Sequence, residues 1–305
     1  MADYAHYVKR KLVVVNYGNR NAEWFQKHQP DDQGFGAPTY HITKSKSKCK
    51  SKSKSKSTKA AARVKVGDTI WIFSQLRTPW DTPPATKGTR SAVALPAALD
   101  AKIVVAKIRH LCSPRYHQSP TFKYYAGKGS RWFPLFDCSK VISRLRTIDS
   151  KRVTKIDTNR RPLPHLCKKN QQIGNALQSM RQLADGRPLL DLEAQFSKRG
   201  FDFVSYRLKD GTRSALMQVR RLIREGRPVF WDRWSLPRGM AERRETQSPK
   251  VLNPHILKAL NRHIRRSIQN SCTVWGIQSD LYAQRGSYSR REKQQAKRLA
   301  KLKLI

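Results

Sequence analysis

The residues best suited to chemistry are polar side chains that follow an apolar run in the C-terminal third of the chain. The run FDFV leads into Ser205, Tyr206 and Arg207, where a strand is expected to end. Asp210 and Gly211 follow at the start of a helical pattern, where free N–H groups can bind a phosphate group. Asp210 has an equally good interpretation as a helix N-cap. This pattern predicts a ligand site at the end of a strand.

The elements that must position these residues alternate between strand and helix. The strand candidates are the short apolar runs at 201–207, 227–233 and 271–279. The helix candidates, with apolar residues every three or four positions, lie at 216–223, ending at Gly226, and at 256–268. Such alternation predicts an α/β fold with a parallel sheet, in which ligands bind beyond the carboxyl ends of the strands.

One acidic residue lies in the last helical pattern, which begins near Ser289 and is strongly basic. Glu292 is flanked by Arg290, Arg291 and Lys293. The simplest interpretation is a solvated surface carboxylate paired with a neighbouring cation. The flanking cations also favour the ionised form of the carboxylate. That form suits an electrostatic stabiliser better than a proton donor.

Three segments of this region resemble the Toll/interleukin-1 receptor (TIR) domain over about residues 200–300. In chain order they are FDFVSYRLKDG, VFWDRWSLPRG and SDLYAQRGSYSRREKQQA. The family has an apolar strand ending in Ser-Tyr, a strand ending in Asp with a Pro/Gly loop, and a Ser-containing strand that leads into a helix with a Glu. The residues of the last segment that match the family's order and spacing are Ser279, Tyr282, Tyr288, Ser289 and Glu292. The resemblance implies a TIR-like parallel sheet over 200–305.

Many TIR domains cleave the nicotinamide glycosidic bond of NAD+, and the resemblance implies that Glu292 is the catalytic residue. Breaking this bond develops oxocarbenium character on the ribose, which a nearby carboxylate can stabilise. Nicotinamide leaves as a neutral molecule, so we expect no metal and no cofactor, with NAD+ as the substrate. The resemblance also implies self-association through the TIR-like domain. The residues that it places around NAD+ are Ser205, Tyr206, Arg207, Asp210, Trp231, Asp232, Trp234, Ser279, Tyr282 and Tyr288.

Two features of the resemblance bear on the completeness of the site. In the family, the loop that corresponds to 231–237 gates the pocket and forms contacts between copies. Trp231 can stack on nicotinamide or adenine there, although packing in the core is the stronger expectation. A complete TIR domain continues past the glutamate helix with further strands and helices, whereas 13 residues follow Glu292. We therefore expect a parallel sheet short of its last strands, unless other segments complete it.

The N-terminal part, over 1–150, is expected to be β-rich. Its strand candidates lie at 11–18, 66–76 and 100–108. With the aromatic segment KYYAGKGSRWFPL, they loosely resemble the PUA-like barrels of EVE and YTH domains, which hold a modified nucleobase in an aromatic cage. The candidate nucleic-acid-binding residues, for which packing in a barrel core is the alternative, are Trp71, Trp80, Trp132 and Phe133.

A polar linker with an amphipathic helix is expected between the two parts, over 151–199. The segment 171–196 repeats apolar residues at roughly helical spacing. The residues that this spacing puts on one face are Ile173, Leu177, Met180 and Leu183.

The net charge of the chain limits its partners. Lys and Arg number 63 against 21 Asp and Glu, which gives +42. A Lys/Ser tract at 44–59, expected to be a disordered loop, carries only eight of these charges, so most of the excess lies on the folded parts. Such an excess predicts nucleic acid or another polyanion as a partner.

The remaining composition excludes several classes of protein. No apolar run approaches the ~20 residues of a membrane span, and the N-terminus lacks a signal-peptide pattern. We therefore expect no membrane association and a cytoplasmic location. The five cysteines are scattered without a CxxC pair, and the histidines show no metal-ligand spacing, so no metal site is predicted.

Two functions from different classes follow from these observations. The first is an NAD+ glycohydrolase effector that is controlled by an N-terminal sensor of nucleic acid or nucleotide, with antiphage defence as the setting that the resemblance implies. The alternative is a non-enzymatic, basic nucleic-acid-binding protein whose TIR-like region mediates protein contacts. A ribosome-associated or chromatin-like basic protein is disfavoured by the seven tryptophans and the ordered α/β motifs.

Overall fold

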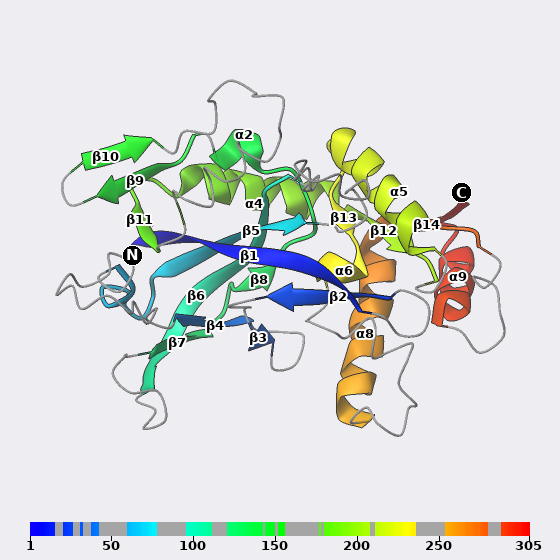
Figure 1. The fold of residues 1–305 in the computed structure, drawn as a ribbon, viewed down its shortest axis with the longest axis horizontal. Helices are drawn as coiled ribbons and strands as arrows, with labels where there is room; N and C mark the ends of the chain where they lie inside the picture. The colour runs from blue at the N-terminus through cyan, green and yellow to red at the C-terminus, as the bar shows by residue number, and fades with distance from the viewer. Residues whose placement is uncertain are drawn as a thin grey trace, which may run out of the picture.

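A computed structural model describes most of the folded elements of the 305-residue chain. The described residues are 1–15, 21–26, 31–32, 38–42, 60–77, 96–111, 121–142, 144–149, 152–155, 177, 180–207, 211–235, 254–279 and 288–305. Five of the expectations above fall outside them, namely those for the tract at 44–59, Trp80, Ile173, Asp210 and Tyr282. The fold is of mixed α/β type, with a large mixed sheet and a separate, all-parallel sheet (Figure 1). No helix within these ranges is long and apolar enough to cross a lipid bilayer.

The C-terminal part is built on four parallel strands. They are β12 (Phe201–Ser205), β13 (Val229–Phe230), β14 (Ser271–Gly276) and β15 (Leu302–Leu304). Their order in the sheet is β13-β12-β14-β15, and all neighbours are parallel. In chain order this is 2-1-3-4, as in the flavodoxin-like doubly wound sheet. The predicted parallel sheet is confirmed, and β15 is a strand that was not predicted.

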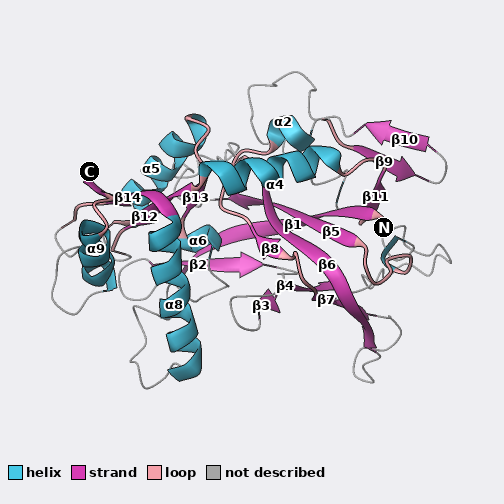
Figure 2. Cartoon of the chain, turned by 180° about the vertical axis from the view of Figure 1, so that it is seen from behind, coloured by secondary structure: helices cyan, strands magenta, loops and turns pink. Residues whose placement is uncertain are grey.

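Helices cover both faces of this sheet, because its central strand is apolar on both sides. Along β12, Val204 packs in one core with α5 (Thr212–Arg224). Its neighbour Phe203 packs in another core with α8 (Pro254–Asn270) and α9 (Tyr288–Arg298). Successive side chains of a strand point to opposite faces, which explains this division. Figures 1 and 2 show α5 on one side of the sheet and α8 with α9 on the other.

Helix α5 ends where its sequence predicts, just before Gly226. This glycine has a φ of 70°, in the left-handed region that glycine adopts without strain. Its N–H donates to the Ile223 carbonyl at 3.0 Å, and the Arg227 N–H donates to the Leu222 carbonyl at 2.9 Å. These two bonds form a Schellman motif, which directs the chain into β13.

The N-terminal part is a large sheet, as its β-rich sequence predicts. Its described strands run in the order β10-β9-β11-β1-β5-β6-β7-β4-β3, with β2 paired to β1 and β8 paired to β6. The pair β1–β5 is parallel and the others are antiparallel. The strands are β1 (Asp3–Val15), β2 (Asn21–Gln26), β3 (Asp31–Asp32), β4 (Pro38–Ile42), β5 (Thr69–Arg77), β6 (Ala98–Leu111), β7 (Thr121–Ala126), β8 (Arg131–Trp132), β9 (Arg146–Asp149), β10 (Arg152–Lys155) and β11 (Arg181–Leu183).

The segment between the two parts differs from its prediction. A single helical face was expected to include Met180 and Leu183, but residues 181–183 form β11, which pairs with β1 and β9. Helix α4 (Arg187–Arg199) begins only afterwards, with Pro188 in its first turn, where proline is favoured. Tertiary pairing therefore overrides the helical spacing.

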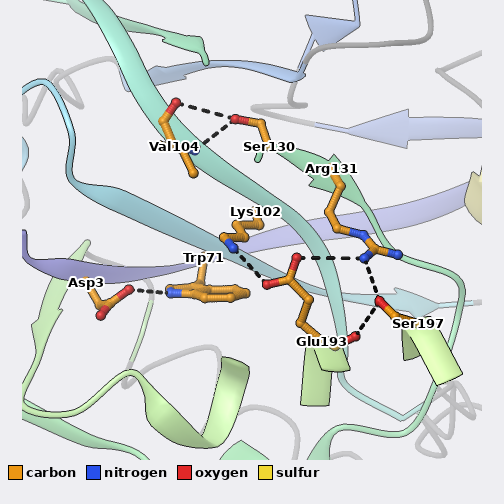
Figure 3. A network of polar contacts seen from close by, with 8 residues as sticks. All are labelled: Asp3, Trp71, Lys102, Val104, Ser130, Arg131, Glu193 and Ser197. Carbon is orange, nitrogen blue, oxygen red and sulfur yellow. Dashed lines mark hydrogen bonds and ion pairs between the residues drawn. The ribbon is translucent and has the colours of Figure 1, made fainter. Parts of the chain in front are cut away.

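Helix α4 is fastened to the large sheet by a network of polar contacts (Figure 3). Glu193 pairs with Lys102 at 2.7 Å and with Arg131 at 3.8 Å. Lys102 also lies 5.3 Å from the centroid of the Trp71 ring, and the Trp71 Nε1 donates to Asp3 at 2.8 Å. The network neutralises cations at the place where α4 covers the sheet. The short helix α2 (Ser139–Ile142) packs in the same core as α4.

The two parts of the chain share one hydrophobic core. Leu135 and Val229 exchange two backbone hydrogen bonds, of 2.8 and 2.9 Å. Their side chains are buried in the same cluster, together with Trp234 of the short helix α6 (Asp232–Ser235). The Trp234 Nε1 donates to the Phe133 carbonyl at 3.3 Å. A change in the N-terminal part therefore reaches β13 and α6 by direct contact.

We expect Leu135→Ala to lower the free energy of unfolding by about 2–5 kcal/mol, because it leaves a cavity in this shared core. Urea unfolding followed by circular dichroism and by tryptophan fluorescence measures the change, and both signals should shift together. Leu190→Ala is the matched control, at a position on α4 that is 47% exposed, where a change within about 0.5 kcal/mol is expected. A loss no larger than that of the control would contradict the shared core.

The fold changes the titration of His263 in α8. Its ring lies 5.8 Å from that of Phe230, measured between centroids. Burial, and then the positive charge of Arg266, lower the pKa of His263 below its ordinary value of 6.5. The folded protein therefore keeps His263 neutral at a pH at which the unfolded chain protonates it.

The free energy of unfolding should consequently fall as the pH drops below the ordinary histidine value of 6.5, because the unfolded chain then binds more protons than the folded protein. We expect a smaller fall in His263→Gln. Urea unfolding of both proteins at about pH 7.5 and about pH 5.5 measures the difference. Groups such as Asp202, whose pKa burial raises, titrate in both proteins and cancel in the comparison. An equal fall in both would exclude His263 as a source.

Candidate active site

The structure brings together two of the residues that the sequence singled out. Ser205 is the last residue of β12, and its Oγ donates a hydrogen bond of 2.7 Å to Oε2 of Glu292 in α9. The two side chains are distant in sequence and both are buried, with relative exposures of 1% for Ser205 and 8% for Glu292. The interpretation of Glu292 as a solvated surface carboxylate is therefore wrong.

The strand alternation explains why these two residues meet. Phe203 faces α8 and α9, so Ser205, two residues further along β12, faces the same side. Glu292 lies four residues before Ala296, which packs against this side of the sheet. Positions four apart lie on one face of a helix, so Glu292 also points inward. Both side chains thus follow from the same packing.

The Ser205–Glu292 pair lies at the position where doubly wound sheets bind their ligands. Ser205 pairs in register with Gly276, the last residue of β14. The strands β12 and β14 are adjacent in the sheet, and the chain order reverses between them, with β13 beyond one and β15 beyond the other. Ligands of such sheets occupy the crevice outside the carboxyl ends at this reversal point.

Glu292 also lines a cavity of about 400 Å³ between α8 and α9. The described residues that line this cavity come from the two helices, and neither Tyr206 nor residues 231–235 are among them. Three arginines and three amide side chains contribute to it, together with one apolar residue. The lining residues are Asn261, Ile264, Arg265, Arg291, Glu292, Gln294, Gln295 and Arg298.

The other polar candidates lie beyond the carboxyl ends of the strands, as predicted. Tyr206 donates from its hydroxyl to Asp232 at 2.7 Å, which joins the end of β12 to the start of α6. Arg207 Nε and Ser279 Oγ follow β12 and β14, and each is buried with no hydrogen-bond partner among the described residues. Both are donors suited to oxygen atoms of a ligand.

The two tryptophans of the 231–237 loop are enclosed by protein. Trp231 and Trp234 are 0% and 2% exposed and pack in the core that the two parts share. Their burial fits the packing alternative, so neither ring presents an open face for stacking. Tyr288 and Ser289 begin α9, and their side chains lie outside the described residues, so their predicted contacts with NAD+ stay predictions.

The described aromatic residues that were predicted to contact nucleic acid also pack in or against the hydrophobic cores. Trp71 and Phe133 are buried in one core, with ring centroids 6.4 Å apart. Trp132 is partly buried against the core on the other face of the large sheet. The three described candidates, Trp71, Trp132 and Phe133, therefore do not form a shared, open cage.

The two ends of β12 carry different polar pairs. At its start, the buried carboxylate of Asp202 pairs with Arg227 at 2.7 Å. Burial raises the pKa of Asp202, while the charge of Arg227 opposes that rise. This pair fixes the beginning of the strand, whereas Ser205 and Glu292 lie at its other end. Within the described ranges, no group of three His, Cys, Asp or Glu residues is placed to hold a metal ion.

Comparison of the chain with protein-family models, with curated proteins and with solved structures found no significant match. The function of the site can therefore be inferred only from its residues and their geometry. Sequence reasoning missed Asn261, Arg265 and Arg298 of the α8–α9 cavity. The signal that could have found them is the repeat of basic and amide residues opposite the apolar stripe of each helix.

The Ser205–Glu292 hydrogen bond is expected to contribute to stability as a pair. We expect a coupling energy of about 1–1.5 kcal/mol between Ser205→Ala and Glu292→Gln in a double-mutant cycle, because glutamine keeps an acceptor oxygen but loses the charge that strengthens the bond. Urea unfolding measures it. Ser271→Ala is the control, a buried serine at the opposite end of β14 that bonds to the Ile268 carbonyl. Its effect should add to that of Glu292→Gln within about 0.5 kcal/mol, and similar additivity for Ser205→Ala would refute the pairing.

Proposed function

We propose that the site at the carboxyl ends of β12 and β14 hydrolyses the nicotinamide glycosidic bond of NAD+, with Glu292 as the catalytic residue. The observation that carries the proposal is the buried Ser205–Glu292 hydrogen bond at the reversal point of a doubly wound sheet. The resemblance to TIR domains singles out the same glutamate. The overall reaction consumes NAD+ and water and yields nicotinamide, ADP-ribose and a proton.

Each part of the site has a role in this reaction. The Glu292 carboxylate stabilises the positive charge that develops on the ribose as nicotinamide leaves. Ser205 fixes the orientation of that carboxylate through its hydrogen bond. The Nε of Arg207 and the Oγ of Ser279 lack hydrogen-bond partners among the described residues and are suited to the diphosphate oxygens of NAD+. The reaction needs no metal, because the leaving group is neutral.

Control by the N-terminal part is also proposed, with a nucleic acid or nucleotide as the signal. Its support is the core that Leu135 and Trp234 share with β13, next to the site. Self-association, a cytoplasmic location and a role in defence against phage complete the proposal. Their support is the resemblance to TIR domains together with the composition of the chain.

The alternative is a non-enzymatic nucleic-acid-binding protein whose TIR-like region mediates protein contacts. The observation that favours it is the charge of +42, which predicts a polyanion as partner without predicting any reaction. The two proposals differ in what Glu292 does. In the alternative, it only holds α9 against β12.

The decisive test is the release of nicotinamide by the purified protein from NAD+, with and without added DNA or RNA. We expect Glu292→Gln to lower the rate about 10²–10³-fold, because it removes the charge that stabilises the transition state. Glu225→Gln, at an exposed carboxylate just after α5, is the matched control and should keep the wild-type rate. If wild type releases no nicotinamide under any of these conditions, or if Glu292→Gln is as active as wild type, the alternative function replaces this one.

A further inference from the structure

Nearly all the charged residues of the two helices on one face of the parallel sheet are basic. Helices α8 and α9 contain nine Lys and Arg residues and a single acidic residue, Glu292. Glu292 points inward and is 8% exposed, so it presents little negative charge to the surface. The outer surface of the helix pair therefore carries positive charge alone. The nine residues are Lys258, Arg262, Arg265, Arg266, Arg290, Arg291, Lys293, Lys297 and Arg298.

The basic residues follow the helical period, on the sides that border the cavity. On α8, Lys258, Arg262 and Arg265 are spaced by four and three residues, which places them in one stripe. On α9, Arg291 and Arg298 are seven residues apart and share a face in the same way. Arg265, Arg291 and Arg298 line the cavity of about 400 Å³ between the helices, together with the single carboxylate of Glu292, so cations outnumber anions in the lining by three to one. Figure 1 shows the two helices next to each other, in orange and red.

Two of the cavity-lining cations, Arg265 and Arg298, differ from cations elsewhere in the fold in their ion pairs. In the N-terminal part, Lys102 and Arg131 pair with Glu193, and at the start of β12, Arg227 pairs with Asp202. By contrast, the guanidinium groups of Arg265 and Arg298 form no ion pair with the residues that the structure describes. Like charges held close together repel, so an added anion would be stabilised between them.

The two helices are joined by contacts that do not use the guanidinium groups of Arg265 and Arg298. Gln295 Nε2 donates to the Arg265 carbonyl at 3.1 Å, which joins α9 to α8 through the backbone. Ile264, Ile268 and Ala296 are buried beneath, against the sheet. The basic side chains are thus presented by rigid elements, which keeps the entropic cost of binding low.

We propose that this α8–α9 basic face binds the sugar–phosphate backbone of a nucleic acid, with one phosphate group in the cavity between Arg265, Arg291 and Arg298. Guanidinium groups bind phosphate oxygens through paired hydrogen bonds, and the amides of Asn261 and Gln294 supply further donors. Contacts of this kind fix the backbone without reading its sequence. This inference rests on the nucleic-acid partner of the proposed function and not on NAD+ cleavage.

The extent of the face favours a polymer over a single nucleotide. The stripe from Lys258 to Arg265 spans about 10 Å, at about 1.5 Å per residue. One strand of a duplex presents a phosphate about every 3.4 Å of axis, so a stripe of this length meets several phosphates in succession. A mononucleotide would contact the cavity and leave most of the stripe unoccupied.

The test is binding of a fluorescein-labelled (dT)20 oligonucleotide to the full chain, followed by fluorescence anisotropy over a range of salt concentrations. We expect Arg265→Gln/Arg298→Gln to weaken binding about tenfold or more at low salt. The slope of log affinity against log salt should fall by about 1.4, because each single-stranded phosphate contact contributes about 0.7. The matched control, Arg213→Gln/Arg224→Gln, removes the same charge from exposed positions on α5 and should bind within about twofold of wild type.

Three outcomes would overturn the proposal. They are wild-type affinity in the α8–α9 variant, an equal loss in the α5 control, and a variant that loses binding of ADP while it keeps binding of (dT)20. The last would assign the cavity to a nucleotide. Arg265→Lys/Arg298→Lys keeps both charges and should retain most of the salt slope, which separates loss of phosphate contacts from loss of fold. Nicotinamide release is measured separately, so a silent enzyme that still binds (dT)20 through this face contradicts only the NAD+ proposal.

Discussion

The burial of β12 on both faces is the constraint on which the C-terminal part depends. This strand lies between β13 and β14 in the parallel sheet, and its residues 202–205, which alternate between the two faces, are all buried. Val204 requires an apolar partner on one side, which α5 supplies, and Phe203 requires one on the other, which α8 and α9 supply. Once these helices are in place, Ser205 must face α9. A hydroxyl buried there needs a hydrogen-bond partner, and Glu292 provides it.

Helix α9 carries both the candidate catalytic carboxylate and part of the basic face. Glu292 is the one acidic residue of α8 and α9, and it is buried, so its carboxylate interacts more strongly with a nearby positive charge than it would in water. Arg291 and Arg298 of the same helix line the cavity shared with α8, which Glu292 also lines. A polyanion on the basic face and a reaction at Glu292 would therefore act on the same helix. The N-terminal part reaches the neighbouring strand β13 through Leu135.

Much of the C-terminal fold could be predicted from the sequence, because its elements carry strong local patterns. The apolar runs and helical periods marked β12, α5, β14 and α8, and Gly226 marked the end of α5. The meeting of Ser205 and Glu292 follows from the alternation of β12 and the helical period of α9. By contrast, β15 is three residues of alternating Leu and Lys, and its identity as a strand depends on pairing with β14. Likewise β11 is a strand because β1 and β9 flank it. The burial of Trp231 and Trp234 depends on a core shared with the N-terminal part, which no local pattern encodes.

The central claim is that the Ser205–Glu292 pair marks the place where NAD+ binds and reacts. A crystal structure of the full chain carrying Glu292→Gln, grown with NAD+, tests it most directly, since the substitution should preserve the substrate. The account predicts that the nicotinamide ribose lies beyond the carboxyl ends of β12 and β14, with a ribose hydroxyl within hydrogen-bond distance of the side chain at position 292. NAD+ bound elsewhere on the chain, with position 292 in contact with protein alone, would contradict it.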